Sequence, residues 1–318
     1  MPTEFDLIRL FFTRPAPGAV LGVGDDAALL CPTTGMELAV TTDMLLLGRH
    51  FLADVDPRLL GHKTLAVNLS DLAAMGATPR WATLALALPE VDETWLTGFS
   101  RGFLELAARF GVDLVGGDTT RGPLNLCVTL LGEIPSGLAL RRDGARAGDE
   151  IWVSGQLGGA ALGLHHLRAA VPLTRGEAMA CRARLHSPEP RVDLGLALRG
   201  LARGAIDVSD GFAADLGHIL ERSGVGAEVA FSRLPAHPAV QARLDDALAR
   251  QCLLAGGDDY ELCFTAPTGV GREVEAAASR VGVRVTRVGR ITSEPGLRIL
   301  DEDGRAMHLE SLGYDHFA

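Results

Sequence analysis

The sequence predicts an α/β (α+β) chain of two domains, in which mixed sheets pack against helices. Its 318 residues are more than one hydrophobic core usually organises, so two cores are expected. Short apolar runs that end in turn residues alternate with helix-like stretches in both halves of the chain. Between the halves lies the loop-like stretch Glu133–Gly137, which places the boundary between domains 1–137 and 138–318.

The hydrophobic periodicity of each segment assigns it to a helix or a strand. The clearest helix covers 57–75, because Pro57 falls in its first turn and Gly76 follows its end. A helix over 94–110 ends before Gly111 in the same way. The other expected helices span 4–12, 158–170, 193–202 and 212–222, and the expected strands span 38–42, 81–88, 112–115, 124–131, 150–154, 205–208, 261–265 and 283–288.

The composition restricts what the chain binds and where it works. A net charge of −10 argues against non-specific nucleic-acid binding, which needs a basic surface. No apolar run approaches the roughly eighteen residues of a membrane-spanning helix, and the start lacks the pattern of a signal peptide, so no membrane partner is expected. The five cysteines form no CxxC pair, which fits reduced thiols in the cytoplasm better than a zinc site.

Aspartates recur where an apolar strand gives way to small residues. Such positions let a carboxylate and the backbone approach a ligand closely. Aspartate after glycine is also common in ordinary turns, but several clusters of the same construction favour a shared acidic site. An acidic chain that binds phosphates needs divalent cations, and these oxygen ligands suit Mg²⁺. The clusters hold Asp25 and Asp26, Asp43, Asp118, Asp207 and Asp210, and Asp258 and Asp259.

Asp71 occurs within the predicted helix 57–75. It is spaced four residues from Val67 and three from Ala74, which places it on a largely apolar stripe. A carboxylate there would be buried, which is unfavourable unless a cation or strong hydrogen-bond donors compensate. With the hydroxyl groups of Thr41 and Thr42, it predicts a Mg²⁺ site; a buried acid satisfied by protein donors is the alternative.

The familiar phosphate-binding motifs are absent. Lys63-Thr64 follows a histidine and lies inside a predicted helix, so it is no Walker A loop. The chain lacks the early-strand lysine and the histidine-arginine-aspartate loop of protein kinases. Residues 22–27 superficially match the dinucleotide-binding pattern, but their two carboxylates would repel an unshielded pyrophosphate and no clear helix follows.

Six motifs, taken in order, resemble those of the thiamine-monophosphate kinase family. Single motifs are shared with aminoimidazole ribonucleotide synthetase and selenophosphate synthetase, whereas the full set resembles the kinase family and covers nearly the whole chain. The motifs are Gly22–Ala28, Thr41–Asp43, Val67–Ala77, Gly116–Gly122, Ile206–Gly211 and Gly256–Leu262, with Tyr314–Phe317 near the end.

This resemblance implies a fold of the aminoimidazole ribonucleotide synthetase type. The N-terminal domains would pair into a homodimer through a β-barrel-like sheet, with ATP held at the dimer interface by several Mg²⁺ ions, and the C-terminal domain would complete the active site. By motif position, the implied metal ligands are Asp26, Thr41, Thr42, Asp43, Asp71, Asp118, Asp207 and Asp210. The implied ATP contacts are Gly117, Asp118, Arg142 and Ser209, and the implied substrate contacts are His50, Asp258 and Tyr314.

The activity implied by the resemblance is ATP-dependent phosphorylation of thiamine monophosphate to thiamine diphosphate. The attacking phosphate oxygen is already ionised near neutral pH, so in-line transfer of the γ-phosphate needs metal ions but no general base and no covalent residue. Glutamate is expected where Asp258 stands, so that contact would be one methylene shorter. Two alternatives stay open: another ATP-dependent synthetase or cyclase of this superfamily, and a Mg-nucleotide-binding protein without catalysis.

Overall fold

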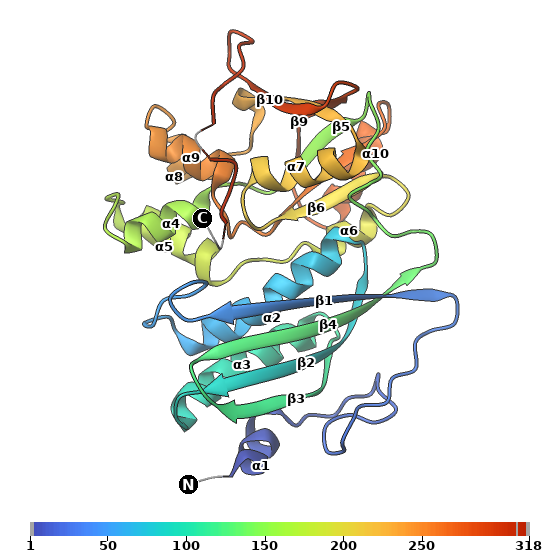
Figure 1. Cartoon of the computed structure of the whole chain (residues 1–318), viewed down its shortest axis with the longest axis vertical. Coiled ribbons are helices and arrows are strands. Elements are labelled where there is room, and N and C mark those ends of the chain that lie inside the picture. Colours follow the sequence, from blue (N-terminus) through green and yellow to red (C-terminus); the bar gives the residue numbers. More distant parts are fainter. Residues whose placement is uncertain (1–2, 310, 316–318) are drawn as a thin grey trace. The chain divides into compact units, whose positions relative to one another are not determined.

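The chain forms two compact units in the computed structural model, which describes residues 3–309 and 311–315. The first unit contains residues up to 72 together with 77–137, and the second contains 73–76 and the residues from 138 onward. Figure 1 shows the elements of both units along the chain. Within the described ranges, no helix is long and apolar enough to cross a membrane.

The first unit is built on one mixed sheet of four strands in the order β1-β4-β2-β3. β4 pairs with β1 and β2 in antiparallel fashion, while β2 and β3 are parallel. Its elements are α1 (Glu4–Leu7), the π-helical turn η1 (Ile8–Phe12), β1 (Met36–Leu46), α2 (Pro57–Ala74, whose last residues group with the second unit), β2 (Thr78–Leu88), α3 (Glu93–Arg109), β3 (Asp113–Arg121) and β4 (Asn125–Pro135).

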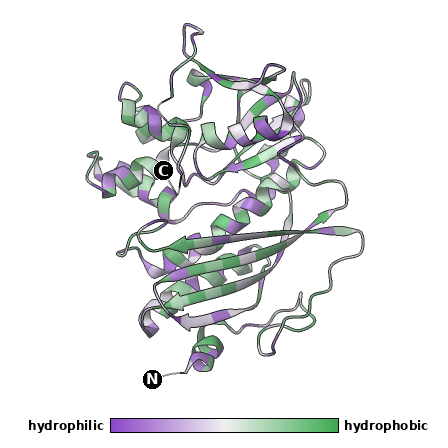
Figure 2. Cartoon of the chain, viewed as in Figure 1, coloured by the Kyte–Doolittle hydropathy of each residue, from purple (hydrophilic) through white to green (hydrophobic). Residues whose placement is uncertain are grey.

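The two faces of this sheet have different surroundings. Helices α2 and α3 cover one face (Figure 1). They approach each other closely, because a Cβ added at Gly61 would lie 2.0 Å from the Phe99 carbonyl oxygen and one at Gly102 would lie 1.9 Å from that of Arg58. The other face of β1 exposes hydrophobic side chains. Figure 2 colours the hydrophobic residues along the strand green. These exposed side chains are Leu38, Val40, Met44 and Leu46.

The second unit contains a mixed sheet of six strands in the order β10-β7-β9-β5-β8-β6. Only the β10–β7 pair is parallel, and the other pairs are antiparallel. Its elements are β5 (Glu150–Ser154), α4 (Gly159–Leu167), α5 (Arg175–His186), α6 (Val192–Ala197), β6 (Gly204–Val208), α7 (Phe212–Ser223), β7 (Gly226–Ala230), the 3₁₀ turn η2 (Phe231–Arg233), α8 (Pro238–Gln241), α9 (Ala247–Ala255), β8 (Glu261–Ala266), α10 (Gly271–Arg280), β9 (Val285–Thr292) and β10 (Gly296–Leu300).

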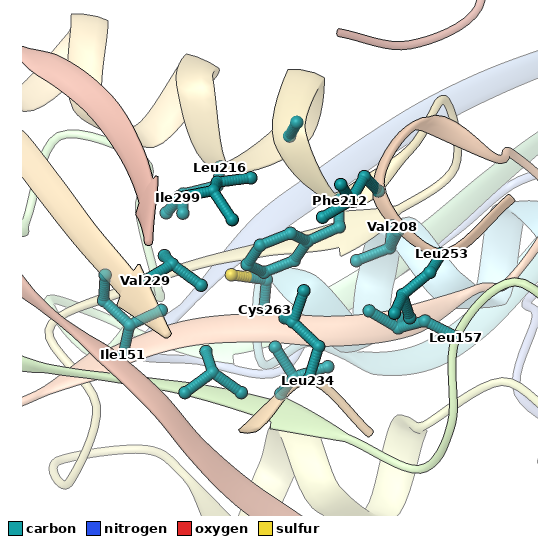
Figure 3. Packing of buried hydrophobic residues seen from close by; sticks show 14 of the residues in the cluster. Ile151, Leu157, Val208, Phe212, Leu216, Val229, Leu234, Leu253, Cys263 and Ile299 are labelled. Atoms are coloured by element: carbon teal, nitrogen blue, oxygen red, sulfur yellow. The ribbon is translucent and has the colours of Figure 1, made fainter. Parts of the chain in front are cut away.

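The core of the second unit lies between this sheet and α7, α4 and α9. Phe212 and Leu216 of α7 pack onto strand residues Val208 and Cys263, and Leu253 of α9 closes the cluster (Figure 3). All five side chains are almost completely buried. This apolar core fixes the ends of β6 and β8, where sequence analysis places several candidate residues.

The expected mixed α/β architecture is confirmed, and the differences concern element ends and short elements. Most strands extend beyond the expected ranges, because pairing in the sheet continues past the apolar run. Sequence analysis missed α5, α8, α9, α10, β7 and β10. The motif residues His316 and Phe317 lie outside the described part of the chain.

Candidate functional site

Polar residues of β1 and α2 meet on the helix-covered face of the first sheet. Strand alternation points Thr41 and Asp43 to this face. The Thr41 hydroxyl donates a short hydrogen bond to Oδ2 of Asp71, and the Asp43 backbone N–H donates to Asn68 Oδ1 at 3.2 Å. Asp71 is partly buried, not fully buried as its stripe predicted. Sequence analysis missed Asn68, although it is three residues before Asp71 and therefore on the same side of α2.

Two other candidates in the first unit lie on the opposite, open face of the sheet. The side chain of Thr42 alternates with those of its neighbours, and its hydroxyl lies 2.9 Å from Thr129 Oγ1. The register pairs Asp118 with Ala85, Ala85 with Cys127, and Cys127 with Met44, so Asp118 is exposed on that open face. The structure therefore does not bring the Thr42 hydroxyl or Asp118 to the group formed by Thr41, Asp43 and Asp71.

Gly117 occupies a place that only glycine fits. Its φ is +147°, and an added Cβ would lie 1.9 Å from the carbonyl oxygen of Leu84 on β2. The backbone of β3 can therefore approach its neighbour closely immediately before Asp118. This conformation agrees with the expectation that the Gly-Gly-Asp motif serves close backbone approach, but it identifies no ligand by itself.

The remaining candidates of the first unit are separate from this group. Asp26 is exposed in the loop before β1, where its backbone N–H bonds the Asp25 carboxylate. His50 follows β1, and its Nδ1 accepts a 2.9 Å hydrogen bond from the Leu46 backbone N–H. Its carbonyl oxygen accepts a bond from the Lys63 ammonium group at 3.3 Å. His50 thus has a structural role in the turn that ends β1.

In the second unit, one buried carboxylate organises the turn after β6. Oδ2 of Asp215 accepts hydrogen bonds from the backbone N–H groups of Ser209, Asp210 and Gly211, at 3.0, 3.1 and 3.0 Å. Burial raises the pKa of Asp215 to about 7, the charge of Asp210 adds to this rise, and the three N–H donors oppose it. Asp215 was not a candidate in the sequence analysis, yet it holds the backbone of two candidates.

Three segments distant in sequence meet at this turn. The Asp258 backbone N–H donates to the Ser209 carbonyl oxygen at 2.8 Å, and the Tyr314 N–H donates to that of Asp210 at 2.9 Å. A Cβ at Gly313 would lie 2.8 Å from the Asp210 carbonyl oxygen, so this approach also requires a small residue. The structure therefore brings together Ser209, Asp210, Asp258 and Tyr314, as the motifs predicted.

Asp207 and Arg142 were also predicted to belong to the site, but they do not share the hydrogen bonds that join this group. Asp207 is buried on β6 and points away from the core that holds Ile206 and Val208. The Arg142 side chain is exposed, and within the described residues it has no hydrogen-bond or ion-pair partner. Its backbone carbonyl accepts a bond from the Ser223 hydroxyl at 2.8 Å.

A buried ion-pair network supports the strand that follows Asp258. The Glu261 carboxylate is 1% exposed and forms a bidentate pair with Arg191, both bonds being 2.6 Å long. Arg184 and the Ser154 hydroxyl donate to the same carboxylate at 2.9 and 2.6 Å. Burial would lower the pKa of Arg191, but the hydrogen bond and charge of Glu261 raise it. Arg191 therefore stays charged.

Two cavities of the second unit contain none of these candidates. One cavity of about 830 Å³ is lined by β5, β9 and the start of α10, and it contains none of the predicted site residues. Glu150 pairs with Arg287 at 2.6 Å, and its carboxylate would lie 3.4 Å from a Cβ added at Gly271. The Glu150 carboxylate thus lies near the N-terminal end of α10, where its negative charge interacts favourably with the helix dipole.

The donor chemistry of the candidate groups fits Mg²⁺. Within the described residues, no three His, Cys, Asp or Glu side chains lie close enough together to hold a metal ion alone. Mg²⁺ does not require such a cage, because it commonly takes one or two carboxylates and completes its shell with phosphate oxygens and water. The Thr41–Asp71 pair in the first unit and Asp210 in the second supply hard oxygen donors of this kind.

Both halves of the chain match known protein domains. Residues 24–134 match the model of the AIR synthase related protein N-terminal domain, and residues 146–302 match that of its C-terminal domain. The thiamine-monophosphate kinase of Salmonella typhimurium is 45% identical over 99% of this chain and 98% of its own length. This chain belongs to the thiamine-monophosphate kinase family.

Solved structures of thiamine-monophosphate kinases have the same fold. The enzyme from Stenotrophomonas maltophilia is 48% identical and superposes with a TM-score of 0.85, covering 92% of this chain and 93% of its own. AaThiL complexed with AMPPCP and TMP is 30% identical, with a TM-score of 0.79 over 90% of this chain and 89% of its own. Membership of the thiamine-monophosphate kinase family therefore rests on both halves of the chain.

Proposed function

We propose that this chain transfers the γ-phosphoryl group of ATP to thiamine monophosphate, which yields thiamine diphosphate and ADP. The observation that carries this proposal is the full-length 45% identity to a thiamine-monophosphate kinase. The binding of AMPPCP, an ATP analogue, and TMP by a 30% identical structure supports the same pair of substrates. The free thiols of all five cysteines are compatible with work in the cytoplasm.

The proposed reaction needs positioning and charge neutralisation more than proton transfer. The phosphate of thiamine monophosphate is ionised near neutral pH, so its oxygen can attack the γ-phosphorus in line without a protein base. This agrees with the proposed metal ligands, which are all carboxylates and hydroxyls. Bound Mg²⁺ would supply neutralisation of the phosphate charges.

We assign the metal-binding role first to the carboxylates that the fold orients. Asp71 is oriented by the Thr41 hydroxyl, and Asp43 lies on the same face. In the second unit, the three N–H bonds to Asp215 fix the backbone of Asp210. The resemblance alone supports the remaining proposed metal ligands, which are Asp26, Thr42, Asp118 and Asp207. It is also the only support for the proposed ATP contacts, which are Gly117, Asp118, Arg142 and Ser209.

The substrate contacts proposed for Asp258 and Tyr314 suit the chemistry of thiamine monophosphate. Its thiazolium ring carries a permanent positive charge, which a carboxylate and the face of an aromatic ring both attract. Tyr314 is 47% exposed, so its ring is accessible to a ligand, and its backbone is tied to Asp210. For His50, the third proposed contact, the turn-forming hydrogen bond supports only a fixed position.

We also propose that two copies of the chain associate through the open face of the first sheet. β1 is an edge strand of eleven residues, and its open face exposes Leu38, Val40, Met44 and Leu46. Exposed apolar surface of this kind, on an edge strand, favours association. Thr42 and Asp118 lie on the same face, so a partner would also cover these two proposed ligands.

Product analysis tests the proposed activity directly. The purified chain is incubated with ATP, thiamine monophosphate and Mg²⁺, and the products are separated by chromatography. We expect equal amounts of thiamine diphosphate and ADP, and no product when EDTA removes the metal. Release of inorganic phosphate without thiamine diphosphate would favour a synthetase or cyclase, and ATP binding without turnover would favour a non-catalytic nucleotide-binding protein.

A further inference from the structure

The loop that carries Asp258 has an unusual backbone. Asp258 and Tyr260 both adopt positive φ angles, of +68° and +49°, although neither is glycine. Residues other than glycine rarely adopt this left-handed backbone conformation, and they keep it only where surrounding contacts hold them in it. The loop therefore has a defined shape that its surroundings must maintain.

Backbone and side-chain bonds hold the loop from both sides. The N–H groups of Asp258 and Tyr260 donate to the carbonyl oxygens of Ser209 and Val208, each at 2.8 Å. Between them, Asp259 turns inward, and its Oδ2 accepts the Gly158 N–H at 2.7 Å. The left-handed turns thus place Asp258 beside Ser209 and fix the position from which Tyr260 extends.

The Tyr260 hydroxyl reaches back to the carboxylate of Asp258. It donates a hydrogen bond to Oδ1 at 3.2 Å, and the tyrosine side chain is only 9% exposed. A buried ring cannot move freely, so its hydroxyl restricts the rotation of the more exposed carboxylate.

We propose that Tyr260 is a positioning residue for the thiamine monophosphate site, acting through Asp258. This inference rests on the proposed function, in which the Asp258 carboxylate faces the cationic substrate. Tyr260 holds that carboxylate in its binding orientation before the substrate arrives, so part of the ordering entropy is removed from the binding step. Asp258 is one methylene shorter than the expected glutamate. Its carboxylate can therefore reach the substrate only over a narrower range of side-chain orientations.

The variant Tyr260→Phe tests this role, because it removes the hydroxyl and retains the buried ring. In steady-state assays, we expect the KM for thiamine monophosphate to rise about three- to tenfold, as for the loss of one hydrogen bond to a charged group. The kcat and the KM for ATP should stay within about twofold of the original values. The melting temperature should not change, which separates positioning from a structural role.

A double-mutant cycle provides the control. Asp258→Asn alone should raise the same KM more strongly, and adding Tyr260→Phe to it should cause no further rise, because the hydroxyl acts through that carboxylate. An unchanged KM in Tyr260→Phe, or independent effects in the double variant, would overturn the inference.

Binding of thiamine monophosphate, measured by calorimetry with AMPPCP and Mg²⁺ present, gives a second readout that needs no turnover. If the unmodified chain binds this ligand but forms no thiamine diphosphate when ATP replaces AMPPCP, the proposed reaction is wrong, while a weaker Tyr260→Phe complex still supports the positioning role. Equal affinity of the two proteins refutes the positioning role alone. Failure of the unmodified chain to bind the ligand refutes both.

Discussion

At the scale of single residues, the site depends on carboxylates whose partners fix their direction. Thr41 donates to Asp71, and Tyr260 donates to Asp258. Asp215 acts indirectly: its carboxylate accepts hydrogen bonds from three successive backbone N–H groups and so fixes the turn after β6. In each case a neighbour restricts rotation, so a ligand meets a preorganised oxygen.

Replacing Asp71 by asparagine tests the metal role of the first group. The amide keeps the shape and can still accept the Thr41 hydrogen bond, but it removes the negative charge that would bind Mg²⁺. We expect kcat to fall by at least roughly a hundredfold, since positioning and electrostatic stabilisation provide most of the catalysis in phosphoryl transfer. The exposed Asp303→Asn serves as control and should retain full activity.

Circular dichroism and melting curves should show that Asp71→Asn folds normally. If this variant retains turnover within threefold of the unmodified chain, Asp71 is not a ligand of an essential metal ion.

Replacing Glu261 by glutamine tests the buried network beneath the substrate loop. The change leaves Arg191, whose side chain is 14% exposed, without its charged partner. We expect unfolding in urea to become easier by about 3 kcal/mol, because an uncompensated buried charge is unfavourable. The exposed pair Arg305–Asp303 is the matched control, and Asp303→Asn should change stability by less than about 0.5 kcal/mol. Equal effects in the two variants would show that burial does not strengthen the pair.

At the scale of elements, β1 presents different residues on its two faces. Thr41 and Asp43 face α2, whereas Val40 and Met44 lie on the open face. The strand therefore links the proposed metal-binding group to the proposed contact with a second copy. Period-two alternation follows from strand geometry alone, so the sequence already contained the signal that separates Thr42 from its neighbours.

Introducing a charge on the open face tests the association of two copies. Val40 is 60% exposed, so Val40→Glu leaves the fold of the isolated chain intact while placing a charge in the proposed contact. We expect a dimer for the unmodified chain and a monomer for the variant by light scattering. Val20→Glu, at a 71% exposed site in the loop before β1, should remain dimeric. A dimeric Val40→Glu would place the contact elsewhere.

The N-terminus of α5 predicts a pH effect. Hydrogen bonds from Arg243 and from Thr174 lower the pKa of Glu177 to about 2. A carboxyl group whose pKa is lower in the folded than in the unfolded protein stabilises the fold at pH values above 4.5, the ordinary pKa of glutamate. This stabilisation is lost as the pH falls from 4.5 towards 2. The difference in melting temperature between the unmodified chain and Glu177→Gln should therefore be constant from pH 7 to about 4.5 and shrink below it.

The exposed Glu302 supplies the comparison, because it has no hydrogen-bond or ion-pair partner within the described residues. Its glutamine variant should show little difference at any pH in this range. A Glu177→Gln difference that does not change between pH 5 and pH 3 would contradict the assignment.

The elements that sequence analysis missed differ in the strength of their sequence signals. The helix α5 begins with a capping box of Thr174 and Glu177, which is a recognisable start signal. The strands β7 and β10 have only five residues each and little alternation, so only their pairing in the sheet defines them. For these two strands, local pattern is therefore a weaker signal than pairing with neighbouring strands.

At the scale of the whole molecule, each unit has its own sheet and core, and each carries part of the candidate residues. Sequence analysis predicted the mixed architecture from alternating helix-like and strand-like stretches, and it named as candidates Ser209, Asp210, Asp258 and Tyr314, which the fold brings together. It could not predict the supporting roles of Asn68, Asp215 or Tyr260, because these depend on which side chains face each other after folding. Asn68 and Tyr260 lie inside the family motifs, but the motifs alone do not show which side chain each of them contacts.

The central claim is that carboxylates of this chain hold divalent cations that shield two phosphate-bearing substrates from each other. The most direct measurement is a crystal structure with AMPPCP, thiamine monophosphate and Mn²⁺ in place of Mg²⁺, with the metal located by its anomalous scattering. The account predicts Mn²⁺ at about 2.1–2.2 Å from carboxylate oxygens of Asp71 and of Asp210, with phosphate oxygens completing each shell. Metal peaks bound only by phosphates and water, or at neither aspartate, would contradict it.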